Sequence, residues 1–129
     1  MRILLEVSAG ELVDRICILE LKANRLAPAD RPRVAQQLAR ARARAAKILV
    51  GQQELDQLFD ALRDVNAELW ETEEKLRQLE NAGDFGARFV TLARSVYHTN
   101  DRRAALKRKI DDVCQSELRE HKSYALPQL

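Results

Sequence analysis

Two long stretches of this chain repeat apolar residues at alternating spacings of three and four, which restricts the folds open to it. The first stretch runs from about Gln53 to Glu80 and the second from about Gly86 to His121. Each repeat lines one face of a helix, and such faces are buried when two helices pair along their length. The turn between them centres near residue 83, so the pattern predicts an antiparallel coiled-coil hairpin in which facing residue numbers sum to about 166.

Two shorter helices are predicted before the hairpin. Ser8 and Glu11 have the spacing of a capping box, and the helix that they begin ends before Pro28. A second helix begins near Asp30 and is expected to stop at Gly51. Its apolar positions are Val34, Leu38, Ala41, Ala45 and Ile48. We expect both short helices to fold back over residues 53–71 and 95–113, leaving the hairpin tip, residues 72–94, projecting beyond them.

Composition supports an all-α fold in one domain spanning residues 1–129. The chain holds only 4 Gly and 3 Pro, and its hydrophobic content of 46% is typical of a globular protein. The segment from Met1 to Val7 is expected to be extended. It is too short and too polar for a signal peptide, and no stretch has the length of a membrane span, so we expect a cytoplasmic protein that does not enter the membrane. Cys17 and Cys114 are expected to be free thiols.

The charge alternates along the chain. Residues 1–50 carry a net charge of +5, residues 51–80 carry −6 and residues 81–129 carry +3. Segments of opposite charge are expected to pack on one another. With a net charge of +2 and no coherent basic stripe, we expect no nucleic-acid partner.

Polar residues interrupt the apolar repeats at one common level. By the turn registers, Glu20 falls at the level of Asn66, Asn100 and Arg103, whereas Asp14 falls near Lys107. Buried charges must be paired, so we expect Glu20 to pair with Arg103 and Asp14 with Lys107. This polar layer either fixes the helix register or forms a small anion site with Arg103 and Lys107 as ligands.

Other candidate sites are weaker. Trp70 and Tyr97 fall at nearly the same level on the two long helices and are expected to form an aromatic pair at the edge of the bundle. We find no nucleophile beside a base, no glycine-rich phosphate loop and no set of metal ligands. No catalytic residue, metal or cofactor is therefore assigned, and whether the protein is an enzyme stays open.

The hairpin tip carries a candidate partner surface. Two helices alone shield such residues incompletely, so a protein partner or self-association as a dimer is expected. The lone extended segment at residues 1–7 is a second reason to expect a dimer, because a single strand leaves its backbone groups unpaired. The candidate partner surface consists of Leu76, Leu79, Phe85, Phe89 and Leu92.

Four stretches of the chain resemble an uncharacterised family of short helical bacterial proteins, one of the families known as domains of unknown function. They are GELVDRICILELK at residues 10–22, the pair Leu69-Trp70 with Glu73, DFGARFVTLARSVYHTNDRRAALKRKI at residues 84–110, and SELREHKSY at residues 116–124. The resemblance covers nearly the whole chain and is most specific from Phe89 to Lys107. It implies a helical protein and brings no established activity.

Two classes of function remain. The first is a protein–protein interaction or scaffolding module that acts through apolar helical surfaces. The second is a small-molecule site or enzyme in the polar layer. Small all-helical chorismate mutases bind a dianion with Arg and Lys inside their bundles, and the segment GELVDRICILELKANR loosely resembles their first helix.

Overall fold

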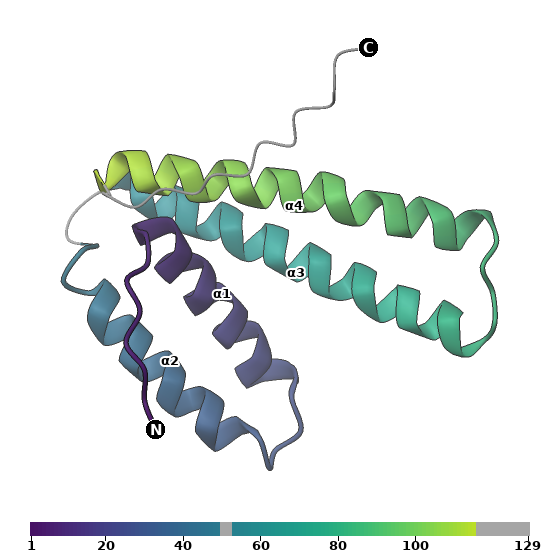
Figure 1. Ribbon diagram of the computed structural model, residues 1–129, viewed down its shortest axis with the longest axis horizontal. Coiled ribbons are helices and arrows are strands. Elements are labelled where there is room, and N and C mark those ends of the chain that lie inside the picture. Colours follow the sequence, from purple (N-terminus) through teal and green to yellow (C-terminus); the bar gives the residue numbers. More distant parts are fainter. Residues whose placement is uncertain (50–52, 116–129) are drawn as a thin grey trace.

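The long hairpin is the largest unit of the computed structural model, which describes residues 1–49 and 53–115. Helices α3 (Gln53–Asn81) and α4 (Ala87–Val113) run antiparallel and lie side by side, and together they extend well beyond the rest of the molecule (Figure 1). The described residues contain four helices and no strand, which confirms the all-α prediction.

The hairpin turn is a Schellman motif. The backbone N–H of Asp84 donates to the carbonyl of Leu79 at 2.9 Å, and that of Gly83 donates to Glu80 at 3.0 Å. Gly83 has a φ of +68°, a left-handed conformation that a side chain disfavours. Further from the turn, Nη1 of Arg102 lies 3.1 Å from Oε2 of Glu68. These facing residue numbers sum to 170 rather than about 166, so the register of the two helices differs by about one helical turn from the one expected from the sequence.

Helix α1 (Ala9–Arg25) crosses the open half of the hairpin and packs against both α3 and α4. The hydroxyl of Ser8 caps it by accepting a hydrogen bond from the N–H of Glu11 at 3.1 Å. Its C-terminal end reaches α3 where Arg25 lies 6.0 Å from the centre of the Trp70 ring. One core cluster lies beneath α1 and consists of Val13, Cys17, Leu55, Leu62 and Ile110.

Helix α2 (Arg31–Ala45) lies on the far side of α1, away from the hairpin (Figure 1). The expectation that both short helices cover the hairpin is therefore wrong for α2. The apolar face of α1 is wide enough to be shared, so α2 buries its own stripe against α1. A second core cluster forms there from Ile16, Leu19, Val34, Leu38, Ala41 and Ala45.

The helix ends differ from the predictions at two places. α2 ends at Ala45, which leaves Ile48 beyond it and half exposed, while the predicted stop at Gly51 lies outside the described residues. α4 ends at Val113 rather than near His121, since Gln115 has a φ of +50° that is incompatible with a continuing helix. Residues 116–129 lie outside the part of the chain that the structure describes.

The segment Met1–Val7 precedes α1 without regular secondary structure. Ile3, Leu4 and Leu5 are each more than 80% exposed. Within residues 1–49 and 53–115, the backbone of this segment forms no hydrogen bond with another backbone group. The segment lines one wall of a groove, and Ile48 lines another.

Candidate functional site

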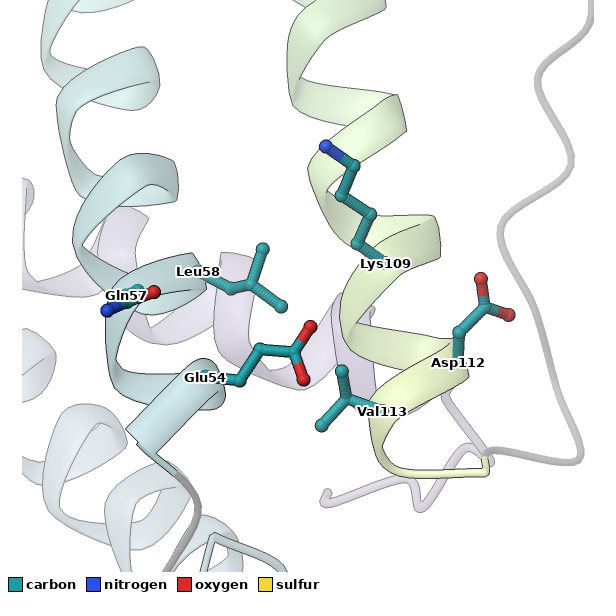
Figure 2. Close-up of a pocket in the computed structure, with 6 residues that line it drawn as sticks. All are labelled: Glu54, Gln57, Leu58, Lys109, Asp112 and Val113. Atoms are coloured by element: carbon teal, nitrogen blue, oxygen red, sulfur yellow. The ribbon is translucent and has the colours of Figure 1, made fainter.

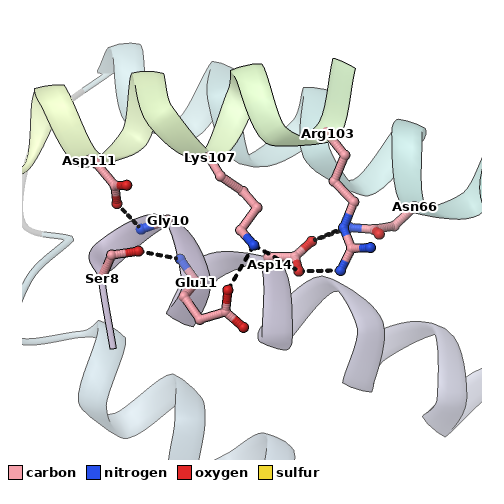
Figure 3. A network of polar contacts seen from close by, with 8 residues as sticks. All are labelled: Ser8, Gly10, Glu11, Asp14, Asn66, Arg103, Lys107 and Asp111. Atoms are coloured by element: carbon pink, nitrogen blue, oxygen red, sulfur yellow. Dashed lines mark hydrogen bonds and ion pairs between the residues drawn. The ribbon is translucent and has the colours of Figure 1, made fainter. Parts of the chain in front are cut away.

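A network of charged and polar side chains joins α1 to α3 and α4 (Figure 3). At its centre is Asp14 of α1, whose side chain is buried. Arg103 of α4 donates to both carboxylate oxygens of Asp14, with the Nε–Oδ1 distance at 2.8 Å. Asn66 of α3 donates to the same Oδ1 at 2.9 Å. One carboxylate therefore ties three helices together, and its charge is matched by a guanidinium.

The neighbouring cation in the network is Lys107, one helical turn after Arg103. Its Nζ lies 2.7 Å from Oε2 of Glu11 and 4.0 Å from Oδ2 of Asp14. The expected proximity of Asp14 and Lys107 is confirmed, but the hydrogen-bonded partner of Lys107 is Glu11. The carboxylate of Glu11 thus points to α4 (Figure 3). Of the two hydrogen bonds of the predicted capping box, the structure shows the one accepted by the hydroxyl of Ser8.

The network ends where α1 and α4 make their closest approach. The N–H of Gly10 donates to Oδ1 of Asp111 at 2.7 Å, and Asp111 is fully buried. A Cβ at position 10 would lie 2.4 Å from the carbonyl oxygen of Lys107. Gly10 therefore sets the separation of the two helices, because only a residue without a side chain fits there.

Glu20 is not part of this network, so the predicted pair between Glu20 and Arg103 is wrong. Glu20 accepts hydrogen bonds from Arg42 of α2 at 3.1 Å and from Arg63 of α3 at 2.8 Å. Glu20 lies six positions after Asp14, which places the two side chains about 120° apart around α1. Burial acts to raise the pKa of Glu20, but the hydrogen bonds from Arg63 and Arg42 outweigh it and lower this pKa.

Asn100 borders the network without joining it. It lines a small cavity of about 180 Å³ with Asn66, Arg103 and Trp70 at the end of α1. Asn66, Asn100 and Arg103 therefore lie at the same height along the hairpin, as expected. The hydrogen bonds of Asn66 and Arg103, however, are made to Asp14.

The predicted aromatic pair between Trp70 and Tyr97 is not formed. The indole N–H of Trp70 donates to Glu74 at 2.7 Å. The ring of Tyr97 lies 4.3 Å from that of His98. Each aromatic residue directly follows a residue of the α3–α4 interface, so it lies roughly 100° around its helix from that interface. Both rings therefore point away from the interface between the two helices, where they were expected to meet.

The charges within the network leave no cation available for a ligand. Two cations, Arg103 and Lys107, are surrounded by three carboxylates, from Glu11, Asp14 and Asp111. Among the described residues, every buried side-chain nitrogen or oxygen has a hydrogen-bond partner. An added anion would have to displace a carboxylate. These contacts are those expected of a device that fixes the position of α1.

Sequence reasoning missed Glu11 and Asp111 as members of the network. A signal was present, because Arg103, Lys107 and Asp111 follow one another at spacings of four and so share one face of α4. Glu11 was assigned to the helix cap alone. Gly10 carried no signal by itself, since a glycine beside a helix start is common.

The hairpin tip extends the same side of α4 beyond the end of α1. Val90, Tyr97, Ala104 and Asp111 follow one another at intervals of seven and form what we call the flank stripe. α1 buries Ala104 and Asp111, whereas Val90 and Tyr97 are 49% and 50% exposed. Of the predicted partner surface, Phe85 is also exposed at 55%, and its ring packs edge-on against Phe89 at 5.3 Å.

The remaining members of the predicted partner surface contribute less exposed apolar surface. Leu76, Leu79, Phe89 and Leu92 are half-buried, because they face the partner helix of the hairpin. The accessible apolar surface of the tip is therefore carried by Phe85 and by Val90 and Tyr97 of the flank stripe.

A surface hollow of about 440 Å³ lies at the open end of the hairpin (Figure 2). Glu54 points across it toward Val113, while Asp112 points away on the other side of α4 (Figure 2). Its polar groups do not converge on one point, so the hollow has no arrangement suited to binding or catalysis.

The two cysteines are free, as expected. Burial and the nearby carboxylate of Glu20 raise the pKa of the Cys17 thiol to about 12. Burial also raises the pKa of Cys114. Neither thiol is activated as a nucleophile, since activation requires a lowered pKa.

Comparison with known proteins gives a family and no function. Residues 3–128 match the model of a family described as "Family of unknown function (DUF6165)". No match is found among curated proteins or among solved structures. Within residues 1–49 and 53–115, no helix combines the length and apolar character needed to cross a bilayer.

Proposed function

We propose that this chain, which belongs to the DUF6165 family of unknown function, is a protein–protein interaction or scaffolding module. In this proposal, the uncovered half of the flank stripe binds an amphipathic helix of a partner protein. The observation that carries the proposal is the contrast within that stripe. Ala104 is 4% exposed beneath α1, whereas Tyr97, seven residues nearer the tip, is 50% exposed.

The shape of the site favours a helix as the occupant. α1 already packs along this side of the hairpin and contacts both long helices. Its coverage ends where Arg25 approaches Trp70 and lies 3.7 Å from Glu71. A second helix placed beyond that point would meet the same pair of helices at the same spacing.

The chemistry of the tip supports an amphipathic partner. The apolar positions Val90 and Tyr97 lie on α4, while the adjacent part of α3 carries Glu73, Arg77 and Glu80. A helix with an apolar face bordered by charges would match both sides. The free thiols are consistent with a reducing compartment, and we place the module in the bacterial cytoplasm.

The alternative, an anion site or enzyme in the polar layer, is less well supported. Arg103 and Lys107 are held by Asp14 and Glu11, and carboxylates outnumber cations around them. The small cavity beside Arg103 is also lined by Glu73, which adds a further negative charge. A dicarboxylate or phosphate that raised the melting temperature in an Arg103-dependent manner would revive this alternative.

The proposed function is tested by site-specific photocrosslinking followed by affinity measurement. A crosslinking amino acid at Tyr97 should capture a protein partner in native cells, whereas the same group at Thr91, exposed on another side of α4, should not. With the identified partner purified, Val90→Asp should weaken binding at least about tenfold, since a charge would enter an apolar contact. Thr91→Asp is the matched control, and equal loss for both variants would contradict the proposal.

A further inference from the structure

The exposed segment at residues 1–7 lies in a part of the molecule remote from the hairpin tip. It combines unpaired backbone groups with three large apolar side chains, Ile3, Leu4 and Leu5, that are each more than 80% exposed. An extended segment in this state is a template for pairing with another strand. The described part of the chain contains no strand that could serve.

We infer that the segments Met1–Val7 of two copies of this chain pair as antiparallel strands around a two-fold axis at Leu4. This interface is independent of the proposed partner site at the tip. With Leu4 opposite its own copy, Arg2 of one chain faces Glu6 of the other, and the pair occurs twice. Ile3 faces Leu5 of the second chain in the same way.

Charge complementarity selects this arrangement over its competitors. A parallel pair would place Arg2 against Arg2 and Glu6 against Glu6, and like charges directly opposite are destabilising. Shifting the antiparallel register by one residue would put Ile3, Leu5 and Val7 of the two chains on opposite faces of the ribbon. Only the register centred on Leu4 pairs both charges and aligns the apolar residues.

The structure also supplies a surface to cover one face of the ribbon. A two-stranded ribbon by itself is marginal in water, so it needs an apolar floor. Leu5 and Val7 line a groove of about 700 Å³ whose other walls include Leu12 and Ile48. In a strand, Leu5 and Val7 share one face, and both line the groove, which Leu4 and Glu6 also line.

Charge swapping on the full-length protein provides the test. Light scattering during gel filtration should give a dimer for the wild type at tens of micromolar. Arg2→Glu alone would place glutamates opposite each other in both cross-strand pairs, and Glu6→Arg alone would place arginines opposite each other. Each variant should therefore raise the dimer dissociation constant by on the order of tenfold or more. An equimolar mixture of the two variants should restore a dimer that contains one chain of each kind. In that dimer one cross-strand pair joins the two unchanged residues and the other joins the two replaced ones, so a mixture that forms no such mixed dimer would count against the inference.

Controls separate this interface from others. Arg15→Glu changes an exposed charge on α1 and should leave the dimer intact. Under mild oxidation, Leu4→Cys should form a disulfide with its own copy, whereas Glu6→Cys should not, since the two copies of position 6 would lie roughly 13 Å apart. A monomeric wild type at several hundred micromolar would overturn the inference. So would dimers that survive both single charge reversals, or dimers that Val90→Asp alone abolishes.

Discussion

Asp14 and Arg103 lie 89 positions apart in the chain, and the guanidinium of Arg103 donates to both oxygens of the Asp14 carboxylate. This contact fixes α1 against α4 at the point where α3 also contributes Asn66. Because Asp14 is buried, its carboxylate needs a cation paired with it.

Replacing Arg103 by Ala should destabilise the fold by about 3 kcal/mol, because it removes the cation that is hydrogen-bonded to the buried Asp14 carboxylate and leaves only Lys107, 4.0 Å away. Arg102→Ala is the matched control. Arg102 pairs with Glu68 on the exposed surface, so its loss should cost less than about 1 kcal/mol. Urea unfolding measures both. If the network is structural, the double variant Asp14→Leu with Arg103→Met should recover much of the loss; recovery by a small anion instead would indicate a binding site.

Gly10→Ala should destabilise the protein even though alanine favours helices more than glycine does. The added Cβ would meet the carbonyl oxygen of Lys107 at 2.4 Å, so α1 and α4 would have to separate. We expect a net loss of about 1–3 kcal/mol, typical of an overpacked contact. Gly86→Ala is the control, since a Cβ there would lie 3.3 Å from the side chain of Asp84. Equal melting temperatures for the two variants would contradict the assigned role of Gly10.

The thiol of Cys17 should make stability fall with pH in the alkaline range. Its pKa is raised from 9.0 to about 12 on folding. Between these values the unfolded chain loses the proton while the folded protein keeps it, so the free energy of unfolding decreases as pH rises, by up to about 1.4 kcal/mol per pH unit. Comparing urea unfolding of the wild type and Cys17→Ala between about pH 8 and pH 10.5, a range that begins below the ordinary thiol pKa, isolates this contribution. An unchanged difference between the two proteins across that range would refute it.

Substitutions on α4 should have different effects on stability on either side of the point where α1 ends. Ala104→Leu places extra atoms beneath α1 at a buried position and should cost about 1–3 kcal/mol. Ala93→Leu, on the exposed surface near the tip, should change stability by less than about 0.5 kcal/mol. Thermal unfolding measures both, and a large loss for Ala93→Leu would mean that the tip is covered within the monomer.

The repeats of the sequence were sufficient to predict the hairpin, the four helices and the common level of Asn66 and Arg103. Local rules governed these features, because apolar periodicity selects a helix face and a turn sets the register within about one helical turn. The free state of Cys17 and Cys114 was also predicted from the sequence, because two isolated thiols do not make a disulfide framework.

The choice of ion-pair partners was decided only by the tertiary structure. The sequence placed Glu20 near Arg103 and Asp14 near Lys107, but Asp14 and Glu20 lie about 120° apart around α1, and α2 docks on the side that holds Glu20. In this arrangement, Glu20 accepts hydrogen bonds from Arg42 and Arg63. Asp14, on another side of α1, accepts them from Arg103. No periodicity in one chain encodes which flank of α1 a second helix covers, because α2 and the hairpin compete for the same helix. The point at which α1 stops covering the hairpin likewise depends on the angle at which α1 crosses it. The exposure of Tyr97 depends on that point.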